Sequence, residues 1–134
     1  MTDKIFIGDD VTSSLKLTKE KLTEMIESIT KSLGFGLPES IYQNALDYEL
    51  RNHLFSVEQE VNIDIVYGLF RVGNVRADII VDQSIIIEMK AVDKIKPKHR
   101  SQLDRYLKFT KCAQGFLINI SYDNYEIEEI KNHL

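Results

Sequence analysis

Two short runs rich in isoleucine and valine, separated by only three residues, constrain the fold of this chain more than any other feature. The first run, residues 76–81, reads Arg-Ala-Asp-Ile-Ile-Val, and the second, residues 85–90, reads Ile-Ile-Ile-Glu-Met-Lys. β-Branched residues fit a pleated, buried surface, so both runs are predicted to be core strands of a sheet. The short connection at 82–84 predicts that the two strands are antiparallel neighbours.

Each of these strands carries a carboxylate, which is costly to bury unless something binds it. With a three-residue turn, Val81 pairs with Ile85, and the antiparallel register then places Asp78 opposite Glu88. Directly opposed residues have Cβ atoms about 4.5–5.5 Å apart, where two bare carboxylates repel but one divalent cation can be bound by both. Lys90 shares a strand face with Glu88. A two-residue turn would separate the two acids onto opposite faces, so the predicted metal site requires the odd-membered turn.

The length and composition are those of one globular domain. The chain has 134 residues, of which 43% are hydrophobic and 28% charged, and a domain of this size buries roughly two thirds of its unfolded surface. No stretch approaches the ~18 consecutive apolar residues of a membrane span, and the polar start is unlike a signal peptide. We therefore expect a single domain over 1–134 that is cytoplasmic or otherwise intracellular and has no membrane partner.

Cysteine and histidine usage excludes other kinds of site. Cys112 is the only cysteine, which excludes an internal disulfide and a zinc site built from several cysteines. The three histidines, at positions 53, 99 and 133, have no ligand-type spacing.

The charge of the chain is unevenly distributed. The net charge is −4, but residues 90–111 contain eight Lys or Arg against two Asp, a local balance of +6 that leaves −10 on the remainder. Clustered Lys and Arg are what bind a phosphate backbone, so a basic rim beside an acidic metal pocket is one interpretation. A solvated helix face is the other.

Apolar periodicity predicts three helices, over residues 17–33, 39–54 and 97–111. Gly34 and Gly36 end the first helix, and Pro38 and Pro97 suit the first turns of the second and third. The residues predicted to face inward are Leu22, Met25, Ile26, Ile29 and Leu33 in the first helix, Ile41, Tyr42, Ala45, Leu46 and Leu50 in the second, and Leu103, Tyr106 and Leu107 in the third.

One more strand is predicted before this pair, the first strand of the pair is extended back to residue 69, and another strand follows the third helix. Residues 56–67 alternate, with Val57, Val61, Ile63 and Ile65 on one face and Glu58, Glu60, Asn62 and Asp64 on a wet face. Residues 69–81 follow, with a kink or bulge near Gly73 and Asn74, and 114–120 form a buried strand. Residues 1–14 are a loose arm or a short strand, and the C-terminal extension 122–134 is a helix or an edge strand. The predicted fold is α/β: a central mixed four-stranded sheet in the order helix-strand-strand-strand-helix-strand, flanked by helices, with an extra N-terminal helix.

This order, with an acid on the second strand and Glu-x-Lys on the third, resembles the restriction-endonuclease-like core of the PD-(D/E)XK nuclease superfamily, and more specifically its GxxExxY group. Ala77 stands where the proline that names the superfamily would be. The resemblance covers roughly residues 17–121. Its motifs are Gly-Leu-Pro-Glu-Ser-Ile-Tyr at 36–42, Ala-Leu at 45–46, Glu-Leu at 49–50, Arg-Ala-Asp at 76–78, Glu-Met-Lys-Ala-Val at 88–92, Gln-Leu-x-x-Tyr-Leu at 102–107 and Gly-Phe-Leu-Ile-Asn at 115–119.

The resemblance implies metal-dependent hydrolysis of phosphodiester bonds that leaves a 5′-phosphate. Mg²⁺ or Mn²⁺ would be bound by Asp78 and Glu88 with help from the Met89 carbonyl, and Lys90 would position or deprotonate a water or neutralise charge in the transition state. The resemblance also places Glu39 near the metal. The candidates are Asp78, Glu88, Lys90 and Gln102 for catalysis, Asp78, Glu88, Met89 and Glu39 for the metal, and Lys96, Lys98, Arg100 and Tyr106 for nucleic-acid binding.

Several of these residues also have an ordinary structural explanation. Glu39 lies in the first turn of its helix, where any acid complements the helix dipole. Gln102 and Tyr106, four residues apart, share a helix face and could simply pack and hydrogen-bond. Asp78, Glu88 and Lys90 could be surface charges at strand ends. The regular alternation of three further acids indicates a solvated strand face rather than a catalytic pair: Glu58, Glu60 and Asp64.

The first functional hypothesis is a nuclease acting on DNA rather than RNA, in repair, recombination or processing of DNA. The alternatives are a nucleic-acid-binding module that keeps the nuclease fold with little or no activity, and a small subunit whose partner supplies DNA binding. A homodimer is compatible with the first hypothesis, but nothing in the sequence identifies an interface.

Overall fold

The computed structural model describes residues 16–132. Helices α2 (Lys19–Leu33) and α3 (Glu39–Asn52) come first, followed by strands β1 (Val57–Tyr67), β2 (Phe70–Val81) and β3 (Ile85–Lys90). Helix α4 (Pro97–Lys108) then leads to β4 (Gln114–Ile120) and β5 (Tyr125–Lys131). The arm or strand predicted for residues 1–14 lies outside the described residues.

The strands form one mixed sheet in the order β1-β2-β3-β4-β5. β3 and β4 are parallel because α4 carries the chain back between them, whereas the other neighbours are antiparallel. The prediction of four strands is therefore wrong by one. Residues 125–131 are the additional edge strand, and their glutamates at 126, 128 and 129 obscure the apolar alternation from which a strand is predicted.

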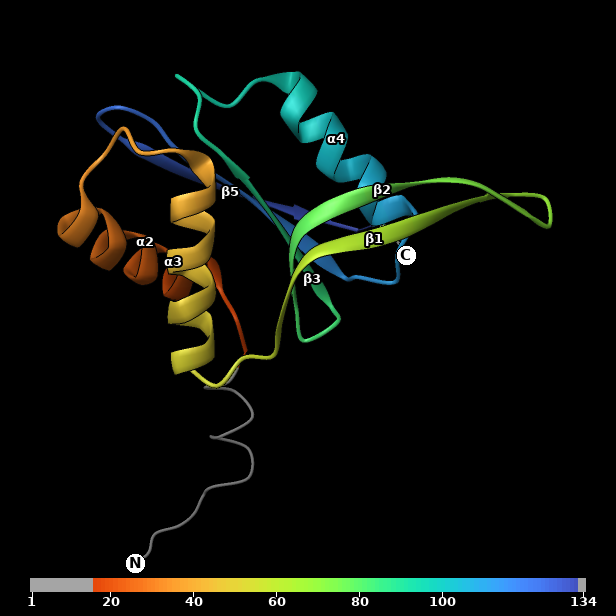
Figure 1. Ribbon diagram of the computed structural model, residues 1–134, viewed down its shortest axis with the longest axis horizontal. Helices are drawn as coiled ribbons and strands as arrows, with labels where there is room; N and C mark the ends of the chain where they lie inside the picture. Colours follow the sequence, from red (N-terminus) through yellow and green to blue (C-terminus); the bar gives the residue numbers. More distant parts are fainter. Residues whose placement is uncertain (1–15, 133–134) are drawn as a thin grey trace, which may run out of the picture.

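The sheet is covered on both faces, by α2 and α3 on one side and by α4 on the other (Figure 1). The core accordingly consists of two clusters of buried side chains. The larger lies under α2 and α3 and includes Leu22, Ile26, Leu46, Leu50, Ile79, Ile87 and Phe116. The smaller lies under α4 and includes Ile63, Ala77, Ile86, Leu103, Leu107 and Leu117. Between residues 16 and 132, no helix is long and apolar enough to cross a membrane.

The helices begin and end near the predicted residues. α2 begins at Lys19, and the Thr18 hydroxyl accepts a hydrogen bond from the Lys21 backbone N–H at 3.2 Å, as an N-cap does. α2 ends at Leu33, and the capping residue Gly34 has a φ of 78°, which suits glycine. α3 and α4 end at Asn52 and Lys108, two or three residues before the predicted ends.

Two residues predicted to face inward, Leu33 and Ile41, are instead exposed. The turn between α2 and α3 is closed by Tyr42, which is buried and donates its hydroxyl hydrogen to the Gly34 carbonyl at 2.7 Å. The same hydroxyl accepts from the Leu37 N–H at 3.2 Å. With the aromatic ring occupying the inner side of this turn, the two aliphatic side chains remain in solvent.

The alternation of β1 and β2 is interrupted at one opposed pair of residues, Glu60 and Asp78. The regular pairing runs from Gln59–Ile79 directly to Val61–Ala77 and omits them, and Glu60 has a φ of 54°. Val57, Ile79 and Val81 belong to the cluster under α2 and α3, whereas Val61, Ile63, Val75 and Ala77 belong to or pack against the cluster under α4. Strict alternation would put all of these odd-numbered residues on one face, so both strands switch faces here.

The prediction that Val57, Val61, Ile63 and Ile65 share one face of β1 is therefore wrong, because a local break in the backbone overrides the two-residue period. The polar side chains predicted for the wet face, Glu58, Glu60, Asn62 and Asp64, are all exposed. A separate register shift at Ile65 and Val66 leaves Val72 without a partner, one residue before the predicted kink.

Candidate functional site

The β2–β3 hairpin has the register that the sequence predicts. Val81 pairs with Ile85 and Ile79 with Ile87, which brings Asp78 opposite Glu88 at the next position. The three-residue turn is held by a hydrogen bond from the Ser84 N–H to the Val81 carbonyl at 3.0 Å. Its first two residues have positive φ, 51° and 55° at positions 82 and 83, as in the primed turns that match the twist of a hairpin.

Where β2 and β3 separate, the carboxylates of Asp78 and Glu88 take the place of backbone carbonyls as hydrogen-bond acceptors. The Asp78 N–H donates to Glu88 Oε2 at 2.8 Å, and the Met89 N–H donates to Asp78 Oδ2 at 2.8 Å. The second oxygen of each carboxylate, Oδ1 and Oε1, has no hydrogen-bond donor among residues 16–132. Both carboxylates are thus fixed in place through one oxygen, and the other oxygen has no hydrogen-bond partner in the described part of the chain.

Burial makes the charge on this pair unfavourable without a counter-ion. Glu88 is only 3% exposed, and its burial, reinforced by the neighbouring Asp78, raises its pKa to about 8. Burial also raises the pKa of Asp78, with the Met89 N–H, which lowers it, as the largest opposing influence. A divalent cation would compensate both charges.

Lys90 extends from the end of β3 into a short chain of polar side chains. Its Nζ donates to Gln102 Oε1 at 2.9 Å, and Gln102 Nε2 donates to the Tyr106 hydroxyl at 3.1 Å. Gln102 and Tyr106 are half-buried on α4, and burial raises the pKa of the Tyr106 hydroxyl. The predicted group is therefore brought together on the α4 side of the sheet, where β2 and β3 separate: Asp78, Glu88, Lys90, Gln102 and Tyr106.

Glu39, the first residue of α3, also lies near this group. Its pKa is raised by burial and then by the charge of Asp78, and it is lowered by Lys90. Met89 contributes only its backbone to the site, because its side chain is fully buried in the cluster under α2 and α3.

Two residues that the sequence analysis did not select, Gln43 and Glu60, are part of the same network. Gln43, on α3 and 6% exposed, directs its Nε2 toward Glu60 Oε2 at 2.7 Å, Gln59 Oε1 at 2.9 Å and the Asp78 carbonyl at 3.2 Å. Gln43 is four residues after Glu39 and so shares its helix face, which was a signal available in the sequence. Glu60 is predicted to lie on a solvated strand face because polar and apolar residues alternate regularly around it in the sequence. Only the break in the backbone places its side chain beside Gln43.

The basic residues predicted to bind nucleic acid differ in their surroundings. Lys96 and Lys98 are exposed at the start of α4. Arg100 is held by Glu128 of β5 through two hydrogen bonds, of 2.6 and 2.8 Å. His99, beside them, is buried and accepts the Lys96 N–H with Nδ1 at 3.0 Å, so it serves as a helix cap.

The side chains at this site fit a small divalent cation with oxygen ligands. Among residues 16–132, no group of three or more His, Cys, Asp or Glu side chains is arranged to hold a metal. Mg²⁺ does not require such a group, since it is usually bound by one or two carboxylates and keeps several waters. The two opposed carboxylates, each with one oxygen that lacks a protein donor, meet this requirement.

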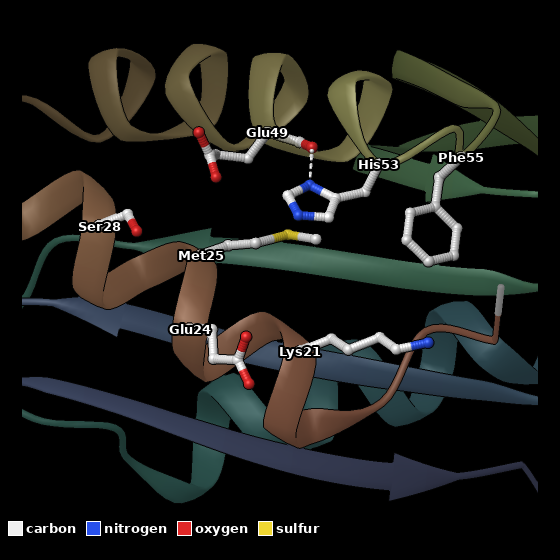
Figure 2. A pocket seen from close by; sticks show the side chains of 7 residues that line it. All are labelled: Lys21, Glu24, Met25, Ser28, Glu49, His53 and Phe55. Atoms are coloured by element: carbon white, nitrogen blue, oxygen red, sulfur yellow. Dashed lines mark hydrogen bonds between the residues drawn. The ribbon is translucent and has the colours of Figure 1, made fainter. Parts of the chain in front are cut away.

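A cavity of about 330 Å³ lies elsewhere, between α2 and α3. Figure 2 shows that His53 points back toward its own helix, where Nδ1 lies 2.7 Å from the Glu49 carbonyl oxygen. The side chains that line this cavity are Lys21, Glu24, Met25, Ser28, Glu49, His53 and Phe55. It contains none of the residues predicted to be catalytic.

A mixed sheet with helices on both faces, and a carboxylate pair followed by a lysine on two neighbouring central strands, is consistent with the restriction-endonuclease-like fold. The sequence pattern of the PD-(D/E)XK nuclease superfamily matches residues 16–132. This chain belongs to that superfamily, whose members are generally phosphodiesterase nucleases and typically use divalent metals.

Among solved structures, the chain is similar to the crystal structure of SSO0001, with 28% sequence identity and a TM-score of 0.56. The match covers 87% of this chain and 58% of that one, so the present chain spans little more than half the length of that protein. No match was found among curated proteins.

Proposed function

We propose that this protein is a nuclease that hydrolyses the phosphodiester bonds of DNA with Mg²⁺ or Mn²⁺ as cofactor. The single observation that carries the proposal is the opposed pair Asp78 and Glu88, each anchored through one oxygen and open at the other. Membership of the superfamily supports nuclease chemistry, and the match of residues 36–42 to Gly-x-x-Glu-x-x-Tyr supports assignment to the GxxExxY group.

The metal would be held by the carboxylates of Asp78 and Glu88, with the Met89 carbonyl and Glu39 as further oxygen ligands. When bound there, a divalent cation supplies Lewis-acid stabilisation of the negative charge that develops on a scissile phosphate. Asp78 and Glu88 contribute fixed positions, because their hydrogen bonds to the backbone of the facing strand prevent them from separating when a cation is absent.

Lys90 is the residue suited to act on the attacking water or on the phosphate. The Gln102 amide holds the ammonium group, and the Tyr106 hydroxyl in turn orients that amide. The lysine side chain can position the attacking water as an ammonium, accept a proton from that water as a neutral amine, or neutralise charge in the transition state as an ammonium. Arginine could fill only the first and third roles, because its guanidinium stays protonated.

The proposed nucleic-acid contacts are Lys96 and Lys98 at the exposed start of α4, with Tyr106 closer to the carboxylates. Arg100 is a weaker candidate than the two lysines, since it must first leave Glu128. DNA is the favoured substrate over RNA, and repair, recombination or processing of DNA is the favoured context.

Labelled single-stranded, duplex and branched DNA, and RNA, incubated with the protein in Mg²⁺ or Mn²⁺ test this proposal. We expect DNA cleavage that EDTA abolishes and that Asp78→Asn lowers by about 10³-fold or more, which corresponds to about 4 kcal/mol of transition-state stabilisation. The exposed loop variant Asp123→Asn is the matched control and should cleave normally. Salt-sensitive binding without cleavage of any substrate would contradict the proposal and favour a binding module.

A further inference from the structure

The far end of the β1–β2 hairpin carries an exposed apolar patch that the proposed function does not use. Beyond the face switch, the two strands project from the body of the protein as an arm (Figure 1). At its tip, Leu69 is 98% exposed, Tyr67 81% and Phe70 76%. Val66 and Val72 are also exposed. We refer to these five residues, Val66, Tyr67, Leu69, Phe70 and Val72, as the tip patch.

The tip is built rigidly rather than left as a loose loop. Tyr67 pairs with Phe70, which leaves only Gly68 and Leu69 to make the turn, and Gly68 takes the positive φ of 65° that such a turn requires. Apolar side chains held on a short hairpin lose little freedom when another surface covers them. A rigid exposed patch is therefore suited to binding.

The charges of the arm do not favour a nucleic acid as the occupant. Its arginines already have carboxylate partners: Arg71 Nε lies 2.7 Å from Asp64 Oδ1, and Arg76 Nε lies 3.1 Å from Glu60 Oε1. Affinity for nucleic acid arises from cations that neutralise phosphates, and on this arm the cations are neutralised internally. The tip patch itself contains no charged residue.

The area of the tip patch suits a symmetric contact. Aromatic side chains bury about 150–250 Å² each, so two aromatic and three aliphatic side chains at these exposures amount to roughly 500 Å², near the upper end for a single patch on a monomer. Two copies of the patch packed together would bury on the order of 1,000 Å² in total, which is the lower limit for a specific interface. Homodimer interfaces are also the more apolar kind.

We infer that two copies of this chain associate through their hairpin arms, with the tip patch of one copy packed on the tip patch of the other about a two-fold axis. Asp78 lies ten positions after Gly68, or roughly 30 Å along the hairpin, so the contact leaves both candidate sites uncovered. The inference does not depend on catalysis, because it rests only on the exposure and composition of the arm.

Sedimentation velocity over a range of protein concentrations tests the inference. The wild type should show a reversible monomer–dimer equilibrium in the micromolar range, and Leu69→Asp and Phe70→Asp should each raise the dimer dissociation constant about tenfold or more. Leu54→Asp is the matched control, because Leu54 is also an exposed leucine, at 81%, after the end of α3. Circular dichroism should show all three variants folded, since no buried side chain changes.

Oxidative cross-linking of Leu69→Cys provides a positional test. A covalent dimer is expected for this variant and not for Leu54→Cys, and the native Cys112 does not interfere because it is buried. A wild type that is monomeric throughout the concentration range, or a dimer that persists unchanged in Leu69→Asp and Phe70→Asp, would overturn the inference. The inference would also be overturned if the two aspartate variants sedimented like the wild type but bound duplex DNA more weakly. The arm would then be a nucleic-acid contact whose apolar side chains insert between bases.

Discussion

The two ends of β2 depart in opposite ways from the usual division between a buried apolar core and a polar surface. The inner end places the carboxylate of Asp78 against the buried Glu88, where each accepts a backbone hydrogen bond. The outer end places Phe70 and Val72 in solvent. The inner part of β2 therefore holds a carboxylate where burial disfavours charge. The outer end of the same strand exposes apolar side chains to solvent. Such departures are expected at positions kept for binding rather than for stability.

Replacing Lys90, which lies on β3 and whose charge acts on Asp78, should distinguish the inner part of β2 from its outer end most clearly. We predict that Lys90→Ala lowers the cleavage rate by about 10²-fold or more at saturating DNA, since the loss of a positioned cation or base typically costs this much. Gln102→Leu should cost less, because it leaves the ammonium present but unheld. In single-turnover assays, Val72→Ala at the outer end should retain the wild-type rate. Normal activity of Lys90→Ala would show that the inner cluster is structural.

The buried carboxylate should cost stability when no metal is present. We predict that Glu88→Gln raises the free energy of unfolding in EDTA by about 1–3 kcal/mol at pH 7, because the buried amide carries no ionisable proton and so avoids the penalty on the charged form that raises the Glu88 pKa to about 8. Urea denaturation checks this, and added Mn²⁺ should stabilise the wild type but not Glu88→Gln.

The matched comparison at the outer end is Phe70→Asn, which should change the free energy of unfolding by only a few tenths of a kcal/mol. A Glu88→Gln variant less stable than the wild type in EDTA would mean that the carboxylate is already well compensated within the protein.

Gln43 should have a smaller effect, since it acts on the site only through its neighbours. We predict that Gln43→Leu costs about 1–3 kcal/mol, because it removes the donor of partly buried hydrogen bonds to the Glu60 carboxylate on β1 and to the Asp78 carbonyl on β2. It should also weaken Mn²⁺ binding several-fold, measured by calorimetry. Asn52→Leu, at the exposed end of the same helix, is the control. Unaltered metal affinity in Gln43→Leu would confine its role to stability.

Most of the fold could be predicted because it depends on local patterns. The bounds of β3 and β4 agree with the predicted strands, since short apolar runs between turn residues leave little choice. The register of Asp78 and Glu88 followed from the length of one turn. β5 could not be decided, because its glutamates conceal a strand that forms at the edge of the sheet by pairing with β4.

The candidate site was predictable where its residues follow one another along a strand or helix. Asp78, Glu88, Lys90, Gln102 and Tyr106 were all selected in the sequence. Glu60 was not, because its relation to Asp78 arises from a residue with φ of 54° inside a strand, a conformation that a non-glycine residue adopts only when its surroundings impose it. The two-residue alternation of a strand in the sequence cannot predict such a backbone conformation.

The amide of Gln43 has two hydrogens, yet three oxygens lie within reach of it. At any instant one of those oxygens must therefore share a hydrogen or go without. The Asp78 carbonyl, at 3.2 Å, is the most distant of the three, so it is the first to be released. The main chain of Asp78 is thus tethered loosely on its α3 side, whereas its carboxylate stays anchored to β3 by the Met89 N–H.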